Sequence, residues 1–244
     1  MAEAYFDENP VTTVIFDLDG TLRQSLPGGD NFMLEYAAEL GVTCTDECFI
    51  ATRQWAHRYW ASSENLMIDQ ERYGRGERAF WENYARRTLE TLGAPPDKVK
   101  ELAPKLHEHM HRNYRPVDDI PHDVRPTLSR LRQAGLTIGL LTNRTDSPGE
   151  YLQEIGLAPE LDFFISAGEI GSWKPDPECF FYSMGMARSL PQETLYIGDN
   201  YYADIIGARQ AGIHPVLIDR ERIFPEPDCE VIYEIGELTG LLGL

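Results

Sequence analysis

The feature that most constrains the fold is a regular alternation of short apolar runs and helical patterns that begins at residue 122. Four of the runs (residues 136–141, 163–165, 195–197 and 215–218) have the apolar composition of buried strands. Strands that alternate with helices form βαβ units, and therefore a parallel sheet covered on both faces. A separate run of the same kind, residues 11–16, is needed to complete the sheet. These patterns predict an α/β fold with a Rossmann-like, doubly wound parallel sheet.

Residues 30–114 interrupt this pattern with helical segments and no convincing strand. The longest segment is 69–92, which is amphipathic and carries two glycines in its early part. Because one strand precedes this block and the others follow it, the block is an insert into the sheet domain. We expect an α/β core of residues 1–23 and 120–244, and a helical domain of residues 24–119.

Helix starts in the core are marked by proline. Ser147-Pro148 and Asp176-Pro177 each place a capping side chain before a proline, which is favoured at the first helical position. We also expect helices at residues 124–134 and 202–211.

The charge balance argues against some partners. There are 40 acidic and 22 basic residues, a formal net charge of −18, so nucleic acids and anionic membranes would be repelled. No apolar run approaches the ~18 residues of a membrane span. The first residues, MAEAYFDENPVTT, are acidic and polar, unlike a signal or transit peptide. The four cysteines form no C-x-x-C pair and suit free thiols in a reducing compartment. We expect a cytoplasmic protein with no nucleic-acid or membrane partner, as a monomer or a homodimer.

Polar side chains follow four of the expected strands. In an open parallel sheet, ligands bind outside the carboxyl ends of the strands. The segments at these positions are, in chain order, Asp17-Leu18-Asp19-Gly20-Thr21-Leu22, Thr142-Asn143-Arg144, Ser166 with Lys174-Pro175 soon after, and Gly198-Asp199-Asn200 with Asp204 one helical turn on. We expect them to meet at one edge of the sheet.

The residue types at this edge suit phosphate chemistry. Asp17, Asp19 and Asp199 would repel one another, and a divalent cation relieves that repulsion; oxygen ligands favour Mg²⁺. Thr142 and Lys174 supply a hydroxyl and an ammonium for a tetrahedral dianion. One aspartate can attack phosphorus, and a second acid can protonate the leaving alkoxide and activate water. Asp17 and Asp19 are two residues apart in an extended segment, so they point to the same side.

These segments resemble the motifs of the haloacid dehalogenase superfamily. Asp17-Leu18-Asp19-Gly20-Thr21 is similar to its D-x-D-G-T first motif, and Thr142, Lys174 and Gly198-Asp199…Asp204 resemble the second, third and fourth, in the same order. The resemblance covers the whole α/β part, about residues 11–22 and 122–220, and the helical insert resembles the type 1 α-helical cap of this superfamily.

The resemblance implies that Asp17 is the nucleophile that becomes an aspartyl phosphate. It implies that Asp19 is the general acid/base and that its backbone carbonyl helps to bind Mg²⁺. The other implied roles are phosphate binding by Thr142, Lys174 and a backbone N–H of Asn143, metal binding by Asp199, and support of the metal shell and Lys174 by Asp204.

The presence of Asp19 argues against dehalogenation, because members of the superfamily that remove halide lack an acid/base at this position. The implied function is Mg²⁺-dependent hydrolysis of a phosphomonoester of a small cytoplasmic metabolite. A sugar phosphomutase of the same superfamily is the alternative enzyme, and a non-catalytic binding or regulatory module on the same fold is the alternative of another class. Arg23 departs from the usual apolar or small residue and either binds an anionic substrate tail or covers the hinge.

Substrate choice is expected to lie in the helical insert and in the hinges near residues 22–30 and 115–123. Its early part is rich in arginine and aromatic residues, namely Arg53, Trp55, His57, Arg58, Tyr59, Trp60, Arg72, Tyr73 and Arg75. Periodic aromatic residues usually form core, so we expect packing rather than a pocket at any one of them. His107, His109 and His111 diverge around a helix and are expected on the surface.

Overall fold

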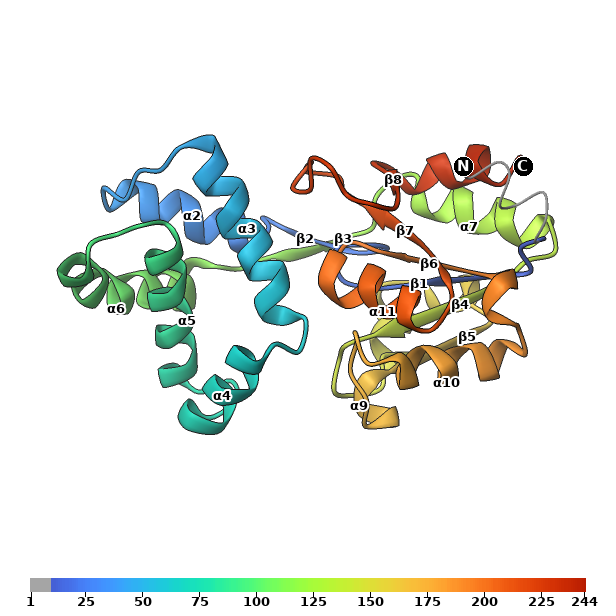
Figure 1. Cartoon of the computed structure of the whole chain (residues 1–244), viewed down its shortest axis with the longest axis horizontal. Coiled ribbons are helices and arrows are strands. Elements are labelled where there is room, and N and C mark those ends of the chain that lie inside the picture. The colour runs from blue at the N-terminus through green and yellow to red at the C-terminus, as the bar shows by residue number, and fades with distance from the viewer. Residues whose placement is uncertain (1–9) are drawn as a thin grey trace. The chain divides into compact units, whose positions relative to one another are not determined.

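The structure is a computed structural model that describes residues 10–244 (Figure 1). The chain divides into two compact units: unit 1 contains the described residues up to Gln24 together with Asp118–Leu244, and unit 2 contains Ser25–Val117. Among residues 10–244, no helix has the length and apolar character that a membrane crossing requires. Most of the segment on which we based the absence of a leader, residues 1–9, lies outside the described residues.

Unit 1 is built on a six-stranded sheet in the order β5-β4-β1-β6-β7-β8. Its strands are β1 (Thr13–Phe16), β4 (Thr137–Thr142), β5 (Phe163–Ser166), β6 (Thr194–Gly198), β7 (His214–Ile218) and β8 (Glu230–Ile232). Every neighbouring pair is parallel, which confirms the predicted parallel α/β core. The first strand of the chain lies between β4 and β6, so the residues that follow β1 are central on the sheet edge.

Helices cover both faces of this sheet (Figure 1). On one face, α7 (Val124–Gln133), α8 (Gly149–Glu154) and α12 (Leu238–Leu241) pack on side chains such as Phe16, Leu140 and Ile197. On the other face, α10 (Pro177–Ala187) and α11 (Ile206–Gln210) pack on Ile15, Leu141 and Tyr196. Successive strand residues point to opposite faces, which explains why all four positions of β1 are buried.

Three details of the helices differ from expectation or refine it. Asp176 caps α10 as predicted, since its side chain accepts a hydrogen bond from the Glu178 N–H at 3.0 Å. The Ser147 prediction was wrong: α8 begins at Gly149 after Pro148, without a side-chain cap. The expected helix at 202–211 starts with a π-helical turn, η3 (Tyr201–Ile205), before α11 continues it.

Unit 2 consists of five α-helices, namely α2 (Gly29–Glu39), α3 (Asp46–Trp60), α4 (Glu64–Tyr73), α5 (Arg78–Thr91) and α6 (Pro96–Asn113). They enclose their own apolar core, which includes Tyr59, Phe80, Leu89 and Leu106. The expected single helix over residues 69–92 is two helices, because the chain turns at Gly74 with φ +79°.

Two short strands, β2 (Gln24–Leu26) and β3 (Val117–Asp119), pair where the chain passes between the units. α9 (Ala167–Ile170) follows β5 directly and ends at Gly171 in the left-handed region.

Candidate active site

Asp17 is the first residue after the central strand β1, and its backbone N–H donates to the carbonyl of Ile197 at 2.8 Å. This bond ties the start of the loop to β6. The side chain is buried, and one carboxylate oxygen, Oδ1, accepts a hydrogen bond from Lys174 at 2.6 Å. Burial raises the pKa of Asp17 to about 7 even though Lys174 opposes the shift.

Lys174 is the cation at the centre of the site. Its ammonium donates to Asp17 Oδ1 and to Asp204 Oδ1, each at 2.6 Å, and to the hydroxyl of Tyr196 at 2.9 Å. Burial works against its charge, but the two carboxylates outweigh it and raise the pKa of Lys174 well above its ordinary value. An ammonium has three N–H donors, and these three oxygens match that number. Lys174 therefore acts here by holding Asp17 in place and by its positive charge.

Asn143 holds the backbone of Lys174 at two points. Its side-chain oxygen accepts from the Lys174 N–H at 2.8 Å, and its amide nitrogen donates to the Lys174 carbonyl at 3.0 Å. The loop after β4 therefore fixes the residue that neutralises Asp17. The sequence predicted a backbone contribution from Asn143 to phosphate, and this side-chain role was missed.

Asp204 contacts Lys174, the residue that the resemblance implied it supports. It is buried, and its second oxygen, Oδ2, accepts from the backbone N–H of Asn200 at 2.9 Å. Asn200 in turn caps η3, since its side-chain oxygen accepts from the N–H groups of Tyr202 and Ala203. Gly198 is required here, because a Cβ on it would lie 2.2 Å from Cγ of Asp204.

Asp17, Asp199 and Asp204 form the acidic group that is able to hold a cation. Each offers a carboxylate oxygen, and these oxygens lie within 4.8 Å of one another. Burial, and then the charges of Asp17 and Asp204, raise the pKa of Asp199 well above its ordinary value. A single ammonium faces the three carboxylates, so a bound divalent cation would offset charge that Lys174 leaves uncompensated. The all-oxygen donor set fits Mg²⁺.

Asp19 has a different environment from Asp17. Its carboxylate binds the guanidinium of Arg144 at two points, with Nε and Nη2 each at 2.8 Å, and that of Arg23 at 3.1 Å. The carboxylate of Asp19 is outside the acidic group, although the metal role that the resemblance assigns to Asp19 concerns its backbone carbonyl. The sequence did not indicate the pairing with Arg144.

Thr142 and Tyr196 complete the edge. Thr142 is the buried last residue of β4 and pairs in register with Ser166 of β5. Tyr196 was expected only as part of an apolar strand. Its hydroxyl donates to the carbonyl of Leu141 at 3.1 Å and accepts from Lys174. The sequence signal for this role was a tyrosine within a buried apolar strand, because a buried tyrosine hydroxyl usually needs a hydrogen-bond partner.

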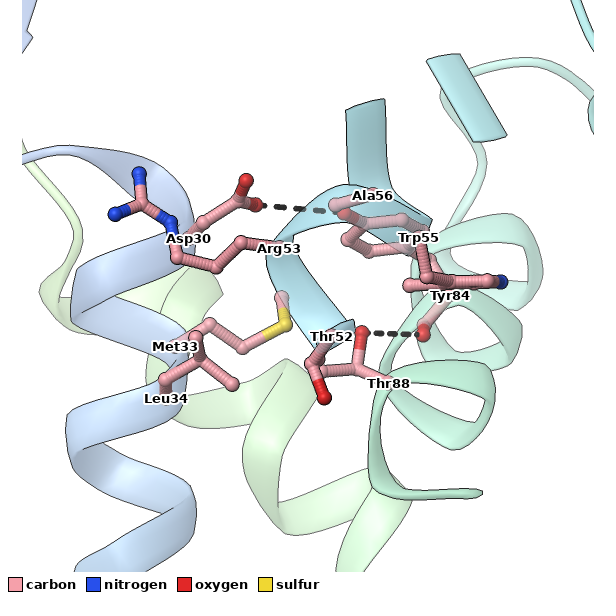
Figure 2. A pocket seen from close by; sticks show the side chains of 9 residues that line it. All are labelled: Asp30, Met33, Leu34, Thr52, Arg53, Trp55, Ala56, Tyr84 and Thr88. Atoms are coloured by element: carbon pink, nitrogen blue, oxygen red, sulfur yellow. Dashed lines mark hydrogen bonds between the residues drawn. The ribbon is translucent and has the colours of Figure 1, made fainter. Parts of the chain in front are cut away.

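Unit 2 contains two pockets that share Asp30, Met33 and Tyr84. Figure 2 shows the smaller one, where the Tyr84 hydroxyl donates to Asp30 at 3.4 Å beside Arg53 and Trp55. Its volume of about 10 Å³ has room for one water at most.

The larger of these two pockets has a volume of about 440 Å³, the size of a small-metabolite site. Trp60, Trp81 and His107 are among the residues that line it. The expectation that His107 lies on the surface was wrong, since it is 8% exposed. Tyr59 is core, as predicted.

The fold and the site define a class of α/β protein: a parallel sheet whose middle strands end at a group of acidic side chains that could hold a cation, with one buried lysine beside them. Within that class, the chain belongs to the haloacid dehalogenase-like hydrolase family, whose model matches residues 11–212. This confirms the resemblance that the motifs indicated.

Relatives and solved structures agree with this assignment. A phosphoserine phosphatase of Thermus thermophilus is 30% identical over 92% of this chain and 95% of its own length. A phosphoglycolate phosphatase of Salmonella choleraesuis is 31% identical over 95% of this chain and 92% of its own. The crystal structure of a HAD phosphatase from Thermococcus onnurineus, 22% identical, has a TM-score of 0.57 over 96% of this chain and 98% of that one, which shows a shared fold. The chain is a hydrolase with phosphatase relatives.

Proposed function

We propose that this protein is a Mg²⁺-dependent phosphomonoesterase that works through an aspartyl phosphate on Asp17. The observation that carries the proposal is the buried contact between Asp17 and Lys174. Oδ1 of Asp17 accepts a hydrogen bond from the Lys174 ammonium at 2.6 Å, which holds the carboxylate in place. With Oδ1 held in this way, we assign Oδ2 as the nucleophile.

The reaction has two halves. In the first, Oδ2 of Asp17 bonds to phosphorus, the ester P–O bond breaks, and Asp19 gives its proton to the leaving alkoxide. In the second, a water oxygen bonds to phosphorus, Asp19 takes a proton from that water, and the P–O bond to Asp17 breaks. Asp17, the carbonyl of Asp19 and Asp199 would hold Mg²⁺. The ion supplies charge neutralisation between the carboxylate and the phosphate.

The substrate class that we propose is a small phosphorylated metabolite. The relatives support this, because phosphoserine and phosphoglycolate are small phosphomonoesters that carry a carboxylate. The net charge of −18 supports a small metabolite over a nucleic acid. We also propose that the protein acts in the cytoplasm.

The testing experiment measures phosphate release from a panel that includes phosphoserine, phosphoglycolate and sugar phosphates, with Mg²⁺ and with EDTA. We expect Asp17→Asn to lower the rate by about 10⁴-fold or more, as loss of a nucleophile does. The variant should fold, because it removes one of three mutually repelling carboxylates. Glu154→Gln, an exposed change in α8, is the matched control and should behave as the wild type.

Release that persists in Asp17→Asn, or that is indifferent to EDTA, would contradict the proposal. Asp19→Asn gives a second test, and we expect it to slow both halves of the reaction, by about 10²- to 10⁴-fold overall. An unchanged steady-state rate in this variant would remove Asp19 from the acid/base role.

A further inference from the structure

We propose that Arg144 is a positioning residue that orients the carboxylate of Asp19 toward the water that hydrolyses the aspartyl phosphate. The inference rests on the proposed function, because it takes Asp19 as the acid/base. Arg144 follows the second motif, and neither the motif nor the proposed reaction gives it a role.

The contact between Arg144 and Asp19 is a two-point one. Nε binds Oδ2 and Nη2 binds Oδ1, both at 2.8 Å. Two parallel bonds from a planar guanidinium fix the plane of a carboxylate as well as its position, which a single bond does not. Arg144 therefore determines the direction in which each oxygen of Asp19 points.

Arg144 is itself held from two sides. Its guanidinium lies over the ring of Tyr151, 4.0 Å from the ring centroid, which is a cation–π contact. Its backbone carbonyl accepts a hydrogen bond from Gly168 at 3.1 Å, so the loop after β4 is tied to α9. A Cβ at Gly168 would lie 1.8 Å from the carbonyl oxygen of Thr145, so the close approach of these two segments depends on this glycine.

Arg23 makes a weaker contribution to the same carboxylate. It reaches Asp19 through Nη1 alone, at 3.1 Å, and its Nε and Nη2 donate to Asp118. The Arg23 guanidinium is thus divided between two acids, whereas Arg144 uses its fork on Asp19. This difference selects Arg144 as the residue that sets the orientation.

Loss of the orientation should affect the two halves of the reaction differently when the leaving group is good. 4-Nitrophenolate needs no proton to leave, so formation of the aspartyl phosphate from 4-nitrophenyl phosphate does not depend on Asp19. Hydrolysis always does, because water must lose a proton as its oxygen bonds to phosphorus and the P–O bond to Asp17 breaks. A variant that lacks the clamp should therefore accumulate the aspartyl phosphate.

The experiment mixes 4-nitrophenyl phosphate rapidly with wild type, Arg144→Gln and Arg125→Gln in the presence of Mg²⁺. For Arg144→Gln we expect a burst of about one 4-nitrophenolate per chain, then a steady state about 100-fold slower than wild type, the size of a misplacement effect. Arg125→Gln is the matched control: Arg125 is an arginine of unit 1 whose side chain donates to the carbonyls of Ile155 and Gly156, and its loss should leave both phases unchanged.

Arg144→Lys keeps the positive charge but loses the two-point contact of the guanidinium with Asp19. It replaces Arg144→Gln as the test if Arg144→Gln fails to fold. We expect its burst to be smaller than the one expected for Arg144→Gln. A wild-type steady state in the Arg144 variant, or a slower rate without a burst, would overturn the inference. Failure of the proposed function has a separate signature, since wild type would then release 4-nitrophenolate without dependence on Asp17, or not at all.

Discussion

Gly20 lies against the acidic group, at a position where any side chain would collide with Asp199. The residue has φ +91°, and a Cβ on it would lie 2.2 Å from Oδ2 of Asp199. We expect Gly20→Ala to lower the free energy of unfolding by more than the ~1 kcal/mol of a left-handed alanine, because Asp199 must also move. Since Asp199 is a proposed metal ligand, phosphate release should fall as well. Denaturant unfolding and initial rates measure the two effects.

Gly135 is the matched control for this change. It has φ +82°, and no atom lies within 4 Å of the position its Cβ would take. Gly135→Ala should therefore lose only the conformational ~1 kcal/mol and keep full activity. Equal losses of stability and activity in the two variants would show that the close approach to Asp199 is unimportant.

The residues that the sequence predicted at the sheet edge share one property: they are polar and come directly after apolar strands. Asp17, Thr142 and Asp199 have that signal, and the structure places all three at the ends of β1, β4 and β6. Tyr196 and Arg144 lack it. Tyr196 reads as a strand residue, and the partner of Arg144 is 125 positions away, so only the fold brings the pair together.

At the scale of elements, α4 and α5 are joined by a partly buried ion pair between Asp69 and Arg87. Asp69 accepts hydrogen bonds from Arg87 at 2.6 and 2.9 Å and from the Tyr59 hydroxyl at 2.9 Å. The sequence predicted one helix here. Two glycines in its early part hinted at a break, but the ion pair across the turn had no local signal, because Asp69 and Arg87 are 18 residues apart.

This pair predicts a pH dependence of stability. Burial opposes ionisation of Asp69, but the hydrogen bonds from Arg87 and Tyr59 outweigh it and lower the pKa of Asp69 below its ordinary value. A lowered pKa in the folded state means a stabilising contribution that is present above about pH 4 and is lost as the pH falls through the folded-state value. Asp69→Asn should thus cost about 2 kcal/mol at pH 7, and less at low pH.

Urea unfolding of wild type and Asp69→Asn from pH 7 to pH 2 measures this difference. Glu90→Gln serves as the control, because Glu90 pairs with Arg86 on the exposed side of α5, with 48% of its side chain accessible. The control should differ from wild type by less than about 1 kcal/mol at every pH. A difference between wild type and Asp69→Asn that stays constant with pH would contradict the assignment.

At the scale of the whole molecule, the periodicity predicted an α/β core interrupted by a helical insert, and the comparisons confirm the family. The sequence did not predict the short strands β2 and β3, inside which the boundaries between the units fall. β8 was missed as well, because its three residues Glu230–Ile232 are too short for a periodic signal. The pockets of unit 2 depend on how its helices pack, and periodicity shows only which faces are apolar.

The division into two units leads to a prediction about which part of the protein Mg²⁺ stabilises. All three carboxylates of the acidic group belong to unit 1 and follow its middle strands β1 and β6. A cation that binds the folded site stabilises the part of the structure that it ties together, by about 2.7 kcal/mol at 100 times the Kd. In hydrogen–deuterium exchange with Mg²⁺ against EDTA, we therefore expect slower exchange in β1 and β6, and unchanged exchange in α5 and α6. Asp199→Asn should abolish the effect, because it removes a ligand. Protection by Mg²⁺ that appears in α5 and α6 instead, or that survives in Asp199→Asn, would place the cation elsewhere.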